Sequence, residues 1–199
     1  TNFYDCFWNA YYSQPTPAAP SAPFAHQFAA RVVALDASLL TQATVTLPGG
    51  APTQTLSDLG NGYYLWQSAT FAAESELLTS FPAGIYTHSI SGGDLGDQSA
   101  TLERPETDLY TSTIPAFTED SWNSMQHVDA GMDFDLSFNS FLPGAGSNLG
   151  LTFVTLYDPD GHVVFNELYP NETTSTIIPA NTLLPGRTYT AVLFFSSRI

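Results

Sequence analysis

The sequence predicts an all-β protein in which two antiparallel β-sandwich modules follow one another, preceded by an extended N-terminal arm. Three observations favour this fold class. From about Phe24 onward, short runs of alternating apolar and polar residues are separated by turns rich in glycine and proline. No amphipathic helical pattern of ordinary length interrupts these runs. The 199 residues are enough for two modules of about a hundred residues each.

Residues 1–24 form the predicted arm. Large rings crowd its first twelve residues, and the prolines between Pro15 and Pro23 keep the second half of the arm extended. The aromatic part is too apolar to remain in water, so it packs either on its own module or on a neighbouring copy. The stiff proline stretch favours the neighbouring copy. The expected assembly residues are Phe3, Tyr4, Cys6, Phe7, Trp8, Tyr11 and Tyr12.

The first module is expected to span residues 25–112. Its predicted strands are short alternating segments at 28–35, 43–47, 62–66, 85–91 and 99–103. Glycines within 48–52 and 58–62 supply the turns between them. One short helix is predicted at 74–81, before Pro82.

The second module is expected to span residues 113–199. At 132–138 the alternation is clean, so Met132, Phe134, Leu136 and Phe138 are predicted to face the core, with Asp133 and Asp135 toward water. The segments 149–158 and 162–168 flank the turn sequence DPDG and predict a hairpin. Residues 174–195 supply the closing strands.

The two halves share one short pattern. Tyr-Thr follows a proline by four residues twice, from Pro82 to Tyr86 and from Pro185 to Tyr189, which agrees with a duplicated module. Residues 184–190, LPGRTYT, resemble the tyrosine corner of fibronectin type III domains. That resemblance implies Ig/fibronectin III-like sandwiches with structural corners at Pro82, Tyr86, Pro185, Gly186 and Tyr189.

A wider resemblance covers the chain from about Phe28 to its end. The segments TVTLPGG, SFPAGIYTHSISGG, DAGMDFDLSFNSF and IIPANTLLPGRTYTAVLFF resemble uncharacterised secreted tandem β-sandwich proteins of Verrucomicrobia-like bacteria. The resemblance implies an exported bacterial all-β protein. It brings no catalytic residues with it.

Charge excludes several classes of function. The formal net charge is −15 and the sequence contains no lysine, so binding to nucleic acid or to anionic lipid is disfavoured. Chemistry that needs a lysine nucleophile or a phosphate-binding lysine is excluded too. No apolar run is long enough to span a bilayer, and no signal peptide is present, so we expect a mature extracellular or cell-surface form without membrane insertion.

No catalytic constellation is recognisable, and we expect no enzymatic activity and no cofactor. Ser91 lacks the first glycine of a nucleophile elbow. The histidines His26, His88, His127 and His162 are scattered and have no metal-ligand spacing. A nucleophile formed by Cys6 and a histidine is rejected, because we expect Cys6 to lie in a flexible arm. Asp133 and Asp135 would need a cleft to act as a glycosidase pair.

Two kinds of binding residue stay as weaker candidates. Asp94 with Asp97, and Asp158 with Asp160, offer oxygens to Ca²⁺, but both pairs are also ordinary turn sequences, so no metal site is predicted. Tyr64 and Trp66 share one face of a strand. They form either a carbohydrate-binding platform or, as we favour, part of a core.

The resulting hypothesis is a non-catalytic structural subunit of an extracellular surface assembly, such as a filament of identical copies joined through the arm. The single cysteine, Cys6, is then buried or paired with the same residue of a partner. The alternative hypothesis is an adhesion or carbohydrate-binding module that uses the Tyr64/Trp66 face, with a glycan as its partner.

Overall fold

A computed structural model describes residues 3–107, 110, 111, 113–145 and 147–198. The chain forms two compact units. The first consists of Thr1–Tyr11 and Pro23–Glu106, and the second of Tyr12–Ala22 and Thr107–Ile199. The chain therefore passes from one unit to the other three times. The division differs from the predicted arm of 1–24 and modules of 25–112 and 113–199, and residue 112 lies outside the described residues.

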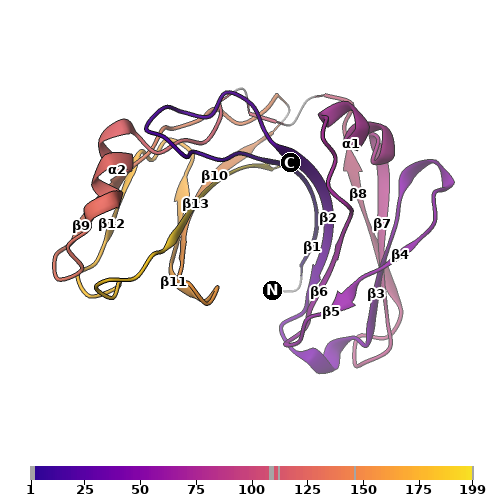
Figure 1. The fold of residues 1–199 in the computed structure, drawn as a ribbon. Coiled ribbons are helices and arrows are strands. Elements are labelled where there is room, and N and C mark those ends of the chain that lie inside the picture. The colour runs from indigo at the N-terminus through magenta and orange to yellow at the C-terminus, as the bar shows by residue number, and fades with distance from the viewer. Residues whose placement is uncertain (1–2, 108–109, 112, 146, 199) are drawn as a thin grey trace. The chain divides into compact units, whose positions relative to one another are not determined.

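The first unit contains two four-stranded antiparallel sheets (Figure 1). In one sheet the order is β1 (Phe3–Tyr11), β2 (Ala25–Val33), β6 (Tyr63–Gln67) and β5 (Ser57–Asp58). In the other it is β4 (Gln54–Thr55), β3 (Gln42–Thr46), β7 (Gly84–Ser91) and β8 (Gln98–Arg104). Every strand pair is antiparallel, as the sequence predicts for an all-β protein.

Buried side chains from both sheets meet in one core. Phe28 and Tyr64 come from one sheet, and Val45 and Tyr86 from the other, and all four belong to a single cluster. The alternation of apolar residues in each strand directs these side chains to the same interior. A short helix, α1 (Glu74–Ser80), adds Leu77 to this core; two 3₁₀ turns occupy Ala37–Leu39 and Pro48–Gly50.

The N-terminal segment folds onto its own unit. β1 pairs with β2 along its whole length, from Phe3 opposite Val33 to Tyr11 opposite Ala25. Cys6 and Trp8 pack against the first core, and the Trp8 indole N–H donates to the carbonyl oxygen of Phe81 at 3.2 Å. The expected docking of this segment on another copy is therefore wrong for β1, because β1 completes a sheet of the chain that carries it.

The proline-rich segment after β1 belongs to the second unit. The side-chain amide of Gln14 both donates to the carbonyl oxygen of Phe117 and accepts its N–H, each at 2.9 Å. The indole N–H of Trp122 donates to the carbonyl oxygen of Gln14 at 3.0 Å. The proline-rich segment has no regular secondary structure of its own. These three hydrogen bonds attach it to the second unit.

The second unit has a three-stranded and a two-stranded antiparallel sheet. The first has the order β11 (Val163–Pro170), β10 (Leu149–Tyr157) and β13 (Thr190–Arg198). The second pairs β12 (Ser175–Ile178) with β9 (Phe134–Ser137), and an isolated bridge joins Phe117 to Phe138. The predicted hairpin around DPDG is present as β10 and β11.

Its core lies between these sheets. Leu136, Phe138 and Ile178 from one side meet Val154 and Leu156 from the other. Met132 differs from the expectation: it is 64% exposed, because β9 begins only at Phe134, and the turn before it is held by Asp129.

One helix was not predicted, α2 (Glu119–Ser124), which is followed by a 3₁₀ turn at Met125–His127. The Thr118 hydroxyl caps α2 by accepting the N–H of Ser121. None of the helices in the described ranges has the length and apolar character required to cross a lipid bilayer.

Candidate functional site

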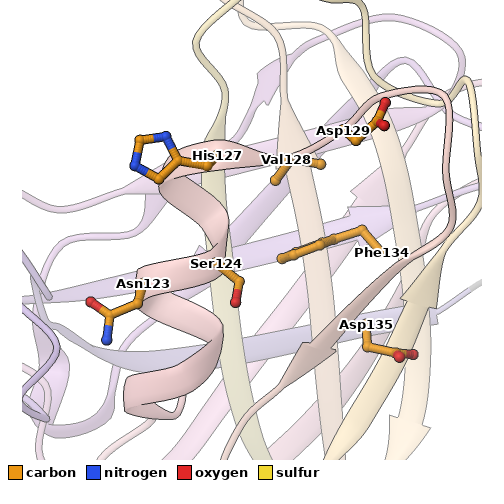
Figure 2. Close-up of a pocket in the computed structure, with 7 residues that line it drawn as sticks. All are labelled: Asn123, Ser124, His127, Val128, Asp129, Phe134 and Asp135. Carbon is orange, nitrogen blue, oxygen red and sulfur yellow. The ribbon is translucent and has the colours of Figure 1, made fainter.

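A hollow on the second unit lies beside α2 and β9 and has a volume of about 560 Å³ (Figure 2). Its lining combines polar and apolar side chains from the helix, the turn after it and the strand: Asn123, Ser124, His127, Val128, Asp129, Phe134 and Asp135. A histidine and two carboxylates in one hollow are the residue types of acid–base catalysis, so their geometry decides what this site can do.

The polar groups of this hollow do not converge. Figure 2 shows His127 and Asp135 on opposite sides of the Phe134 ring, with Asn123 and Asp129 pointing in different directions. Asp129 is already used locally, since its carboxylate accepts the N–H of Gly131 at 2.9 Å. General acid–base catalysis needs an acid and a base that reach the same substrate atom or its neighbours. This hollow offers no such pair.

The first unit brings together two residues, Cys6 and His88, that were not expected to form a pair. The Cys6 sulfur lies 3.8 Å from Nε2 of His88, although 82 residues separate them in the chain. Cys6 lies on β1 and His88 on β7, so the two facing sheets supply one residue each. A pocket of about 220 Å³ adjoins His88 and is lined mainly by apolar side chains.

The premise on which a cysteine–histidine pair was rejected is thus wrong, because Cys6 lies in a paired strand. Electrostatics nevertheless argue against a thiolate nucleophile. Burial raises the pKa of the Cys6 thiol well above its ordinary value, with a smaller contribution from the Asp5 carboxylate. Burial also lowers the pKa of His88. Both shifts favour a neutral thiol beside a neutral imidazole, whereas an activated cysteine requires a lowered pKa.

The remaining catalytic candidates have structural partners of their own. The Ser91 hydroxyl donates to the side chain of Gln42, and the Asp133 carboxylate accepts the N–H of Ala180 at 2.8 Å. Asp135, on the same strand, lies in the hollow described above. His26 is buried in β2 and His162 lies at an exposed turn. Among these residues, His162 lies beside the Asp158 carboxylate.

Comparison with known proteins adds no relative to this picture. No protein-family model matches the chain, and no curated protein sequence matches it either. Any function must therefore be argued from the geometry of the chain itself.

The Tyr64/Trp66 face is not an exposed platform. Tyr64 is 3% exposed, and its hydroxyl donates to the carbonyl oxygen of Leu40 at 3.0 Å. Trp66 is partly buried against the same core. Both side chains are occupied by packing, so the carbohydrate-binding hypothesis loses the surface on which it depended.

The aspartates considered for calcium act within turns. Asp94 accepts the Ser38 hydroxyl at 3.2 Å, and Asp97 accepts the N–H of Gly92 at 3.4 Å. Asp158 accepts the N–H groups of both Asp160 and His162, and these bonds lower its pKa. Asp158, Asp160 and His162 do bring three ligand atoms within 4.8 Å of one another. The hydrogen bonds that Asp158 accepts hold these residues in a turn, and the turn explains why the three ligand atoms lie close together.

The two tyrosine corners differ. Tyr86 is fully buried and its hydroxyl donates to the carbonyl oxygen of Pro82 at 2.8 Å. Tyr189 is only half-buried, and its hydroxyl instead accepts the N–H of Leu184 at 2.7 Å. Between Pro185 and Tyr189, Gly186 adopts a positive φ of 73°, which favours glycine at this turn.

The outer face of the three-stranded sheet in the second unit carries a cluster of apolar side chains, with the Arg198 guanidinium 5.9 Å from the centre of the Phe153 ring. Phe153 lies opposite Leu168 on one side and Phe194 on the other, so three large side chains form a row across β11, β10 and β13. Leu168 is 51% exposed and Phe194 37%. Alternation puts the buried Val154 and Leu156 on the opposite face. The apolar face consists of Leu149, Leu151, Phe153, Leu168, Val192 and Phe194.

Proposed function

We propose that the protein is a non-catalytic structural subunit of an extracellular surface assembly, in which identical copies meet through the apolar face of the second unit. One observation carries the proposal. The row Leu168–Phe153–Phe194 continues across three strands while its ends remain exposed. Contiguous exposed apolar patches characterise interaction surfaces, whereas isolated exposed apolar residues are ordinary.

The proposal includes an Ig/fibronectin III-like architecture for both units, arranged in tandem. The order β1-β2-β6-β5 in one sheet and β3-β7-β8 in the other supports it, since constant-type immunoglobulin sandwiches have the strand orders ABED and CFG. The second unit supports it with an analogous, shorter set of strands. The buried tyrosine corner at Tyr86 is a further feature of such sandwiches.

The contact we propose differs from the one expected from the sequence. β1 completes a sheet of the first unit, and Gln14 is bonded within the second, so the N-terminal segment is held by its own chain. In this proposal the contact between identical copies is made by the apolar face of the second unit and not by the N-terminal segment. Low charge on this face limits repulsion between copies of an acidic chain, because its six residues carry no carboxylate.

Sedimentation of the purified chain over a range of concentrations tests the proposal. We expect association that weakens when a charge is placed on the apolar face by Leu168→Lys. The matched control is Ile85→Lys, which places the same charge at a residue of the first unit that is 57% exposed. A chain that stays monomeric at every concentration, or equal weakening by both variants, would contradict the proposal.

A further inference from the structure

The pocket beside His88 lies between the two sheets of the first unit and has a volume of about 220 Å³. Residues of both β1 and β8 line it, and these are the end strands of the two described sheets. Tyr4 in β1 reaches across to β8, where its hydroxyl donates to the carbonyl oxygen of Thr101 at 3.3 Å. The Tyr4 side chain thus lines the pocket and connects the two strands that flank it.

The walls of this pocket are mainly apolar. One sheet contributes Val32, the other contributes Ile90 and Ala100, and Leu40 and Leu95 come from segments between strands. None of the described residues that line the pocket carries a carboxylate or a guanidinium group. Small-molecule sites in proteins have this composition, a largely apolar lining with a small number of polar groups that orient the ligand.

His88 is the buried polar group of this pocket, with a side chain that is 2% exposed. Its Nε2 faces the sulfur of Cys6, a residue that does not line the pocket. The two nitrogens of an imidazole point in widely different directions, so Nδ1 points away from the thiol. Among the described residues Nδ1 has no hydrogen-bond partner. A buried polar atom without a partner is costly, and a bound molecule that supplies one recovers that cost.

The charge state of His88 restricts the kind of molecule that can supply this partner. Burial lowers the pKa of His88, which keeps the imidazole neutral near pH 7. A neutral imidazole has one donor and one acceptor nitrogen, and a hydroxyl group can bond to either of them. An anion would gain no ion pair from a neutral ring and would be repelled by a chain whose formal net charge is −15. A neutral hydroxyl compound therefore fits best.

We propose that this pocket binds a small neutral phenol, whose hydroxyl group bonds to Nδ1 of His88 while its ring lies between the two sheets. Facing sheets are about 10 Å apart, so the space between them is flat and accommodates a planar ring. The rings of Tyr4 and His88, with centroids 5.1 Å apart, provide aromatic contacts. An apolar cavity of about 150 Å³ is enough to bind benzene. The inference is independent of the proposed function, which concerns the second unit.

An NMR titration of the full chain with phenol, and with toluene as a ligand of similar shape without a hydroxyl group, tests the proposal. The methyl signals of Val32 and Ile90 report on the pocket, and those of Leu168 and Val192 report on the apolar face of the second unit. We expect phenol at millimolar concentration to shift the pocket signals, with a Kd about five- to tenfold lower than that of toluene, as one hydrogen bond provides. His88→Leu should remove this difference between the two ligands.

A second variant fills the pocket without changing His88. Ala100 lies beside His88 in the paired strands and lines the pocket, so the larger side chain of Ala100→Leu occupies the space of the ligand. We expect this variant to bind phenol at least about tenfold more weakly. The matched control is Thr101→Leu, because the exposed Thr101 follows in the same strand and faces the opposite side. It should bind phenol as the unaltered chain does.

Three results would overturn the proposal. The first is unchanged signals of Val32 and Ile90 in the presence of phenol, which is also the result if another part of the chain already fills the pocket. The second is equal affinity for phenol and toluene. The third is equal weakening of phenol binding by the Ala100 and Thr101 variants. Association through the apolar face is measured separately with Leu168→Lys, so either inference can fail alone.

Discussion

The hydroxyl of Tyr86 donates to the carbonyl oxygen of Pro82 at 2.8 Å from a ring that is completely buried. The ring packs in the first core beside Phe28 and Trp8, with ring centroids 5.5 and 5.3 Å away. Tyr189 has the same spacing from its proline, but its hydroxyl accepts a backbone N–H near the surface. The same four-residue spacing from proline to tyrosine thus produces two corners of unequal burial. Tyr86 lies in β7, which has a strand on each side, whereas Tyr189 precedes β13, which pairs only with β10 among the described residues.

Replacing these tyrosines by phenylalanine should have unequal costs. We expect Tyr86→Phe to lower the free energy of unfolding by about 1–2 kcal/mol, since it removes one hydrogen bond and leaves the Pro82 carbonyl oxygen without that donor. Tyr189→Phe should cost about 0.5 kcal/mol or less, because water can replace the partner of Leu184. Urea unfolding of both variants measures the difference. Equal losses of unfolding free energy in the two variants would show that the difference in burial has no effect on what each tyrosine hydroxyl contributes.

The Cys6 thiol should be chemically inert while the chain is folded. Burial raises its pKa, so little thiolate is present at about pH 8. We expect a thiol-reactive disulfide reagent to label Cys6 at least about tenfold more slowly in the folded chain than in urea. Labelling at the same rate in both states would show that β1 detaches readily from β2, and would restore the free N-terminal arm.

His88 should make the first unit sensitive to acid. Its pKa is lowered in the folded state by burial, although the backbone and charge of Asp5 oppose the shift. Between the unfolded value of about 6.5 and the lowered folded value, the unfolded chain binds more protons, so stability falls as pH decreases through this range. When the pH is lowered from about 7.5 to 5.5, we expect the free energy of unfolding to fall less in His88→Gln than in the unaltered chain, as measured by urea unfolding at each pH. His127→Gln, at a residue outside the core, is the control and should behave as the unaltered chain does.

Much of the fold could be predicted from alternation alone. The strands around Phe28, Val45, Tyr86 and Val154 lie where apolar residues recur every second position. The N-terminal segment could not be placed in this way. Its aromatic rings come in adjacent pairs, Phe3-Tyr4, Phe7-Trp8 and Tyr11-Tyr12, and this pattern does not tell which sheet edge the strand joins. The proline stretch predicted that the N-terminal segment extends away and docks on another copy. Instead, the hydrogen bonds of Gln14 hold this stretch in the second unit of the same chain.

Gln14 should stabilise the second unit although it lies in a stretch without regular structure. Its amide makes two hydrogen bonds with the backbone of Phe117, so we expect Gln14→Ala to cost about 2 kcal/mol in urea unfolding. Gln126→Ala is the matched control, since Gln126 makes one exposed bond to the Trp122 carbonyl oxygen and its loss should cost little. Equal effects would show that the Gln14 bonds do not hold the proline-rich segment.

The candidate sites were harder to predict than the strands. Cys6 and His88 are 82 residues apart, and nothing local in either segment indicates that β1 and β7 face each other. Tyr64 and Trp66 share a strand with alternate side chains, and composition alone does not distinguish a binding face from a core face. Likewise, the pocket beside His88 depends on strand order, which is set by pairings distant in sequence.

Hydrogen exchange resolved by residue in the unaltered 199-residue chain tests the central claim most directly, namely that β1 is a strand of the first unit and not a docking arm. In β2, which pairs on both sides from Ala29 to Val33, we expect slow exchange at successive amides. In β1 we expect slow amides at every second residue, where the N–H points toward β2. The slow amides of β2 are an internal reference for the stability of the first unit. Uniformly fast exchange along β1 in a monomer whose β2 amides remain slow would contradict the account.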